Sequence, residues 1–147
     1  MKRLFILLAL LTSSLFTFAQ TNRNKVNLSD KELVNFLWGF AQAHPDGFTI
    51  GIDTFDQPRE GIVVSYAATQ NSFDKKSLPA VIKHAREHEG FVGGWYNPEN
   101  KKYYFDSNRI FPEDSLAAAV KFARENGQHT AVSYTHLRAH ETTLHLV

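Results

Sequence analysis

Two segments of this chain, 77–87 and 115–125, share seven of eleven residues in the same order, and this repetition constrains the fold more than any other feature. Each segment is followed by a glycine, Gly90 or Gly127, which suits the left-handed cap that often ends a helix. Because the order agrees as well as the composition, the pattern predicts two similar structural units. The alternative is chance similarity between two amphipathic helices, since such helices share Ala, Leu, Lys and Glu.

Each unit is predicted to run strand, turn, strand, helix. In the first unit, 48–52 and 61–67 are rich in β-branched and aromatic residues and flank a polar segment, which predicts a hairpin with a long loop. In the second unit, 91–96 and 102–105 flank Asn97-Pro98-Glu99-Asn100, whose proline and asparagines suit the corners of a turn. The two helices each carry apolar residues at helical spacing, namely Leu78, Val81, Ile82 and Ala85, and Leu116, Ala119, Val120 and Ala123.

A further helix is predicted over 30–43. Ser29 and Glu32 have the spacing of a capping box, and Leu28 with Leu33 can form a hydrophobic staple. The chain is therefore expected to be α+β: an antiparallel sheet from two ββα units with helices packed on it, plus this N-terminal helix. The apolar stripe expected on the N-terminal helix is Leu33, Phe36, Leu37 and Phe40.

The first nineteen residues are typical of a secretory signal peptide. Lys2 and Arg3 precede the apolar run 4–18, and Ala19 provides a small residue for cleavage. Polar residues interrupt and follow the run, so that a membrane anchor is not expected. Residues 1–19 therefore predict export, with a periplasmic or secreted product whose single α+β domain covers 28–131.

The C-terminal residues have a different character. The segment 132–142 resembles the in-frame translation of a transposase-based sequencing adapter, and the resemblance covers eleven consecutive residues. It implies that 132–147 form an artefactual tail outside the domain. We therefore expect the final strand of the sheet to be lost.

Composition narrows the range of partners. Cysteine is absent, so the fold depends on its core alone even in an oxidising compartment, and twelve Phe, five Tyr and two Trp can fill that core. Acidic and basic residues nearly balance between 21 and 131, and the whole chain carries a net charge of only +1. Nucleic acid is therefore not an expected partner. No cofactor is predicted, and the oligomeric state is left open.

An aromatic hairpin provides the first candidate ligand surface. Trp95 and Tyr96 face Tyr104 across the predicted turn, and exposed rings on a sheet can hold sugars or apolar peptide side chains. Because neighbours in a strand point to opposite faces, Trp95 and Tyr96 cannot both lie in the core. Gly93 and Gly94 can let a ligand approach, or they can make room for packing beneath a helix.

Polar segments after the second strand of each unit provide the second candidate. Gln70 and Asn71 belong to one such segment, and Asp106, Asn108 and Arg109 belong to the other. If the units repeat, both segments are connections at the same rim, where loops often carry function. The same residue types also serve as helix caps and turns. A pairing of Asp46 with Asp106 is possible in space but is not decided by the sequence.

One motif permits metal chemistry. The order His84, Glu87, His88 matches the H-x-x-E-H pattern of inverted zincins, in which both histidines bind zinc and the glutamate acts as base. No third ligand is evident, and His84 takes the place that Phe122 has in the second unit. The alternative is a histidine on the flank of a helix. Neither a metal site nor a catalytic residue is predicted.

The runs 46–50, 88–106 and 123–128 together are similar to an uncharacterised small domain found in phage and mobile-element proteins. This resemblance covers most of the chain after the predicted signal peptide and implies the domain boundaries but no activity. From the residues, the favoured function is a non-enzymatic exported module that binds a peptide, glycan or protein. The alternatives are a small metal-dependent hydrolase and an inhibitor or immunity-type partner of another exported protein.

Overall fold

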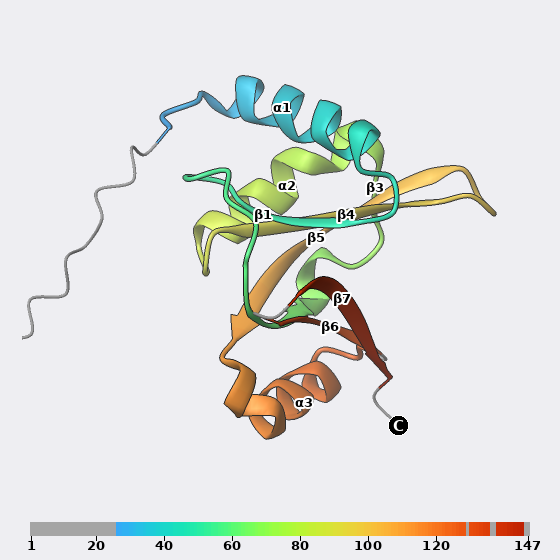
Figure 1. Cartoon of the computed structure of the whole chain (residues 1–147). Coiled ribbons are helices and arrows are strands. Elements are labelled where there is room, and N and C mark those ends of the chain that lie inside the picture. Colours follow the sequence, from blue (N-terminus) through green and yellow to red (C-terminus); the bar gives the residue numbers. More distant parts are fainter. Residues whose placement is uncertain (1–25, 129, 136–137, 146–147) are drawn as a thin grey trace, which may run out of the picture.

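The structure, a computed structural model, describes residues 26–128, 130–135 and 138–145, so that the predicted signal peptide lies outside the described residues. In this described part of the chain, three α-helices lie against one antiparallel sheet, which confirms the predicted α+β class (Figure 1). The helices are α1 (Asp30–Ala43), α2 (Asp74–Arg86) and α3 (Leu116–Glu125). The sheet curls, with α1 and α2 at one end and α3 at the other, all outside the curl (Figure 1).

Within the described residues the sheet contains seven strands in the order β1-β4-β5-β2-β6-β7, with β3 pairing to β5. The strands are β1 (Phe48–Gly51), β2 (Gly61–Ser65), β3 (Ser72–Phe73), β4 (Phe91–Asn97), β5 (Lys102–Phe111), β6 (Thr130–Thr135) and β7 (Arg138–His145). Short 3-10 helices cover Ala67–Thr69 and Glu113–Ser115.

The predicted hairpin of the first unit is wrong. β1 pairs with β4, and β2 pairs with β5, so the β4–β5 hairpin of the second unit lies between the two strands of the first. The physical reason is the connection 52–60, which is too long to impose pairing on its two flanking strands. The short turn at 98–101 does impose pairing, and the predicted second hairpin is confirmed.

The long strand β5 also differs from expectation. The segment 106–111 was predicted as a connection, yet it continues β5 to Phe111 and pairs with β4 on one side and β2 on the other. Its polar residues resemble a loop in sequence. Several of their buried groups have hydrogen-bond partners on neighbouring elements, which lets a polar segment run through the middle of a sheet.

The far edge of β2 is covered. The sequence predicted a lost final strand, but β6 pairs with β2 from Gly61↔Tyr134 to Val63↔Val132 and continues into the pairing with β7. Most of β6 therefore consists of residues from the adapter-like segment. Ala131, the residue just before the adapter-like segment, packs among the buried residues beneath α3. Val132 and Tyr134 line the cavity described below.

Helix α1 has the predicted bounds and the predicted start. The Glu32 amide donates to Ser29 Oγ at 3.4 Å, and the Ser29 amide donates to a Glu32 carboxylate oxygen at 2.9 Å, which completes the capping box. Leu33, Leu37 and Ala41 are its buried residues. Phe36 and Phe40 are half-buried and contact the rings of Phe55 and Phe48 respectively.

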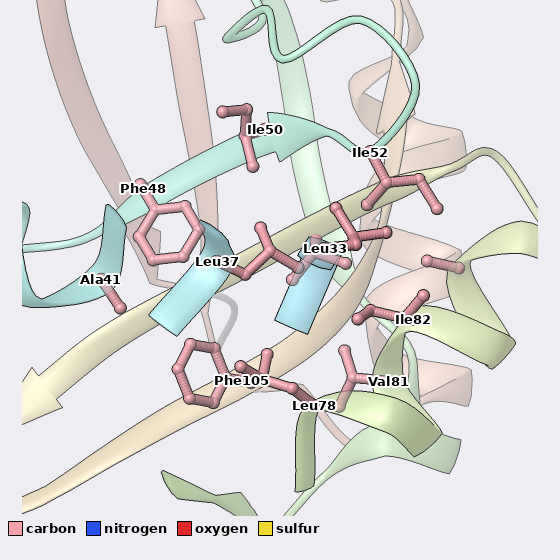
Figure 2. Close-up of a cluster of buried hydrophobic side chains, with 12 residues drawn as sticks. Leu33, Leu37, Ala41, Phe48, Ile50, Ile52, Leu78, Val81, Ile82 and Phe105 are labelled. Carbon is pink, nitrogen blue, oxygen red and sulfur yellow. The ribbon is translucent and has the colours of Figure 1, made fainter. Parts of the chain in front are cut away.

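Two hydrophobic clusters hold the helices to the sheet. The larger one joins α1, α2, β1, β4 and β5, with Phe105, Leu37 and Leu78 fully buried at its centre (Figure 2). The smaller one joins α3 to β2, β5 and β6 around Phe111. In α3 the predicted stripe is only partly correct: Ala119 and Ala123 are buried, whereas Leu116 is 49% exposed.

Gly93 and Gly94 lie where neighbouring side chains and backbone come close to β4. A Cβ on Gly94 would lie 2.8 Å from the Phe105 ring, 2.9 Å from the Phe48 ring and 2.9 Å from a backbone oxygen. A Cβ on Gly93, on the other face, would lie 2.3 Å from the Asn108 amide. Protein side chains thus occupy the space over both glycines, which supports packing rather than ligand approach as their role.

We expect Gly94→Ala to destabilise the protein by about 1–3 kcal/mol, because two core rings and a backbone oxygen have to move. The matched control is Gly39→Ala, where the new methyl meets nothing within 4 Å on the exposed side of α1. That substitution is expected to stabilise the helix by about 0.5–1 kcal/mol. Urea unfolding of both variants measures the difference, and equal stabilities would contradict the packing role of Gly94.

Candidate ligand-binding site on the helix-free face

Alternation along β5 divides its side chains between two faces. Phe105 and Phe111 belong to the two clusters beneath the helices, so the odd-numbered residues of β5 face the helices. Asp106, Asn108 and the opposed pair Trp95–Tyr104 point to the other face, on the inner side of the curl. Four residues that were predicted from two separate regions therefore lie on one face.

A cavity of about 400 Å³ lies on this helix-free face. The two halves of the curled sheet contribute to it from β1 and β4 on one side and from β2 and β6 on the other. Val132 and Tyr134 belong to the adapter-like segment, and the other described lining residues precede that segment. The described lining consists of Asp46, Gly47, Phe48, Thr49, Val63, Ser65, Gly93, Gly94, Trp95, Asp106, Gln128, Ala131, Val132 and Tyr134.

Trp95 is the exposed aromatic residue of the cavity. Its side chain is 42% exposed, and its ring stacks on Tyr104 with centroids 4.9 Å apart and planes 22° apart. The Tyr104 hydroxyl accepts a hydrogen bond of 2.6 Å from the Asn100 amide, which fixes the supporting ring. The pair forms a preordered aromatic platform on the exposed face of this hairpin.

Asn108 forms part of the floor beneath this face. Ser65 Oγ donates to its side-chain oxygen at 2.9 Å, and its amide nitrogen donates to Thr49 Oγ1 at 3.4 Å. These bonds connect β2, β5 and β1 across the space that Gly93 leaves open. Asn108 was predicted to bind ligand, and its buried position instead makes it a structural link between strands.

Asp106 has a different environment. It lines the cavity, and within residues 26–128 and 130–135 no hydrogen bond or ion pair reaches its carboxylate. Burial raises the pKa of the Asp106 carboxyl from its ordinary value of 3.8 to about 6. Asp46, which lies on the turn before β1, is exposed and lines the same cavity. The two carboxylates whose pairing the sequence left open thus share one site.

The remaining predicted residues lie elsewhere. Tyr96 faces the helix side and contacts Tyr103, with ring centroids 4.9 Å apart. Arg109 lies 3.4 Å from a Glu89 carboxylate oxygen and over the ring of Phe122. Because 106–111 is a strand rather than a loop, the expected common rim does not exist. Gln70 donates to a backbone oxygen at the end of α3, and Asn71 adopts a positive φ of 61° in a turn.

The histidines of the H-x-x-E-H motif belong to a cluster between α2 and α3. The rings of His84 and His88 stack at 4.0 Å, and Tyr66 contacts both rings while its hydroxyl donates to Glu89 at 2.7 Å. That bond and burial raise the pKa of Tyr66 to about 12, with burial the larger cause. Among the described residues, no group of three or more His, Asp or Glu side chains is arranged to hold a metal ion.

Sequence reasoning missed Thr49, Ser65 and Gln128 as lining residues of the cavity. Thr49 and Ser65 carry an identifiable signal, because each is a hydroxyl residue within or at the end of an otherwise apolar strand. A buried hydroxyl needs a partner, and here the partner is Asn108 on the strand between them. Because β1 and β2 pair with different strands and not with each other, the sequence did not indicate that Thr49 and Ser65 both bond to Asn108.

Searches of protein-family models, curated protein sequences and solved structures found no match to this chain. The resemblance to a domain of phage and mobile-element proteins therefore stays an expectation. In the part of the chain that the structure describes, no helix is both long enough and apolar enough to traverse a bilayer.

We expect Asp106→Asn to stabilise the protein at neutral pH. In the unfolded chain this carboxyl ionises near pH 3.8, whereas in the fold it ionises near pH 6, so its charge opposes folding increasingly from pH 4 to 6 and fully above. The gain is at most about 3 kcal/mol at pH 7 and falls to near zero at pH 4. Thermal unfolding of both proteins at the two pH values measures it, and a gain that is equal at both would contradict the burial of this charge.

For His84, we expect stability to change with pH in the opposite direction. Burial, together with the nearby His88 ring, lowers the pKa of His84, so the unfolded chain takes up its proton more readily than the fold. Stability from this residue is present above pH 6.5 and is lost as the pH falls below that value. We expect His84→Phe, which installs the residue found at the matching position of the second unit, to lose less stability than the parent between pH 7.5 and 5.5. If the variant lost as much stability as the parent over this range, the lowered pKa of His84 would be contradicted.

Proposed function

We propose that this chain is an exported, non-enzymatic binding module that holds a ligand in the cavity on the helix-free face of its curled sheet. The observation that supports this proposal most directly is Trp95, a large ring exposed at the cavity and held by Tyr104. Export is inferred from residues 1–19 of the sequence.

The exposure of Trp95 favours binding over packing. The fold covers the other face of the same hairpin, where Tyr96 and Tyr103 contact each other and α1 contributes Trp38. A tryptophan left in solvent beside a cavity is the type of residue that contributes most at binding interfaces, because it buries a large area when a ligand covers it. Its stacking on Tyr104 means that little conformational entropy is lost on binding.

The cavity also has the size and composition of a small-ligand site. Its volume of about 400 Å³ lies within the usual range for ligand pockets, and its lining combines apolar residues with a few polar groups. A peptide side chain or a sugar unit fits such a volume. The hydrolase and inhibitor alternatives stay predictions of the sequence, since the described geometry offers no observation that favours either one.

Trp95 itself provides the test. In a Trp38→Phe background, Trp95 is the only tryptophan, and its fluorescence is recorded against a panel of glycans and short peptides. We expect at least one class of ligand to shift or quench the emission in a saturable way. Calorimetry should then show binding weakened by about 30-fold or more in Trp95→Ala, which corresponds to about 2 kcal/mol.

The matched control is Leu116→Ala, another large exposed apolar residue, which lies on α3 on the helix side of the sheet. It should bind like the parent. If no member of the panel changes the emission, or if both variants bind alike, the cavity is not the binding site.

A further inference from the structure

The described residues that line the cavity carry only negative charge. Asp46 and Asp106 are acidic, and none of the described lining residues is Lys, Arg or His. Arg109, three residues beyond Asp106 on β5, faces the helix side and pairs with Glu89. A ligand that enters the cavity therefore meets two carboxylates and no cationic side chain among the described lining residues, which favours a cationic group over a neutral or anionic one.

Of the two carboxylates, Asp106 is the one better placed to bind a cationic group. It is largely removed from solvent, and among the described residues no donor or cation satisfies it. A carboxylate in this state gains a charge-assisted hydrogen bond when a cation is supplied from outside, and this bond is stronger than one between neutral groups. The described residues leave this partly buried charge without a partner, which makes Asp106 a candidate for a functional rather than a structural carboxylate.

The aromatic platform lies within reach of the same ligand. Tyr104 and Asp106 are two residues apart on β5 and point to the same face, so their Cα atoms are roughly 6.5–7 Å apart. Trp95 lies directly opposite Tyr104 and also lines the cavity. A cation on a short aliphatic stem can contact the carboxylate with its head and the indole with its methylenes or its charge, since Trp is the best ring for cation–π contact.

We propose that the ligand of this cavity carries a primary ammonium group, which Asp106 binds as an ion pair while Trp95 covers the adjoining carbons. This inference rests on the proposed function, because it names the chemical class of the ligand for that same site. A lysine side chain and the amino group of an amino sugar both carry this group, and both fit a cavity of about 400 Å³.

The experiment compares charged probes with neutral counterparts at pH 7.5. N-acetyl-lysine amide is paired with N-acetyl-norleucine amide, and glucosamine with glucose. Binding is followed by Trp95 fluorescence in the Trp38→Phe protein and by calorimetry. We expect the charged member of at least one pair to bind at least tenfold more tightly, and added salt to reduce that advantage. The pair that shows the advantage identifies the source of the ammonium group.

The variant Asp106→Asn should reduce the tenfold preference to near onefold, and its thermal stability reports whether the fold is intact. The control Glu125→Gln removes an exposed carboxylate from α3, on the helix side of the sheet, and should keep the preference.

Equal binding of charged and neutral probes would overturn the ammonium assignment and leave the proposed function standing. A preference that survives in Asp106→Asn would overturn the role of Asp106. If none of these probes binds and no member of the wider glycan and peptide panel binds, both the ammonium assignment and the proposed function are overturned.

Discussion

The structure depends on the hydrogen bonding of β5 along both of its edges. This ten-residue strand pairs with β4 and with β2, and β3 joins its β2-side edge near Tyr104, so it is the strand on which both halves of the sheet meet. Because its side chains alternate, one continuous element provides Phe105 and Phe111 to the two cores and Asp106 to the cavity. A change of register by one residue would exchange these two sets and lose both cores at once.

A central strand that is rich in polar residues is stable here because most of its polar groups have partners. The Ser107 amide donates to Thr69 Oγ1 at 2.9 Å, and Asn108 links Ser65 to Thr49. These partners come from segments far apart in the sequence, so their hydrogen bonds add specificity to a sheet whose register apolar contacts alone would fix less strongly. Two side chains of the strand depart from this rule. Ser107 Oγ is buried without a hydrogen-bond partner, and no described residue bonds to the Asp106 carboxylate. Of the two, Asp106 lines the cavity and is therefore the candidate functional group.

In the part of the chain that the structure describes, the helices cover one face of the sheet and leave the other face without a helix. α1 and α2 cover the end of the sheet formed by β1, β4 and β5, and α3 covers the end formed by β2 and β6, all on the same side (Figure 1). Between them the Tyr66, His84 and Phe122 rings fill the gap with edge-to-face contacts. The helix side is thus filled by apolar and aromatic packing, and the concave side carries the cavity.

The sequence by itself determined the features that short-range chemistry controls. The capping box at Ser29, the bounds of α1 and the hairpin around Asn97–Asn100 all depend on residues within a few positions of one another. Alternation likewise showed that Trp95 and Tyr96 could not both lie in the core. The tertiary structure alone decided that β4 and β5 lie between β1 and β2, and therefore that Asp46, Trp95 and Asp106 share a cavity. The physical reason is that strand pairing across a long connection is selected by the burial of whole faces, a property of the assembled sheet that no local pattern carries.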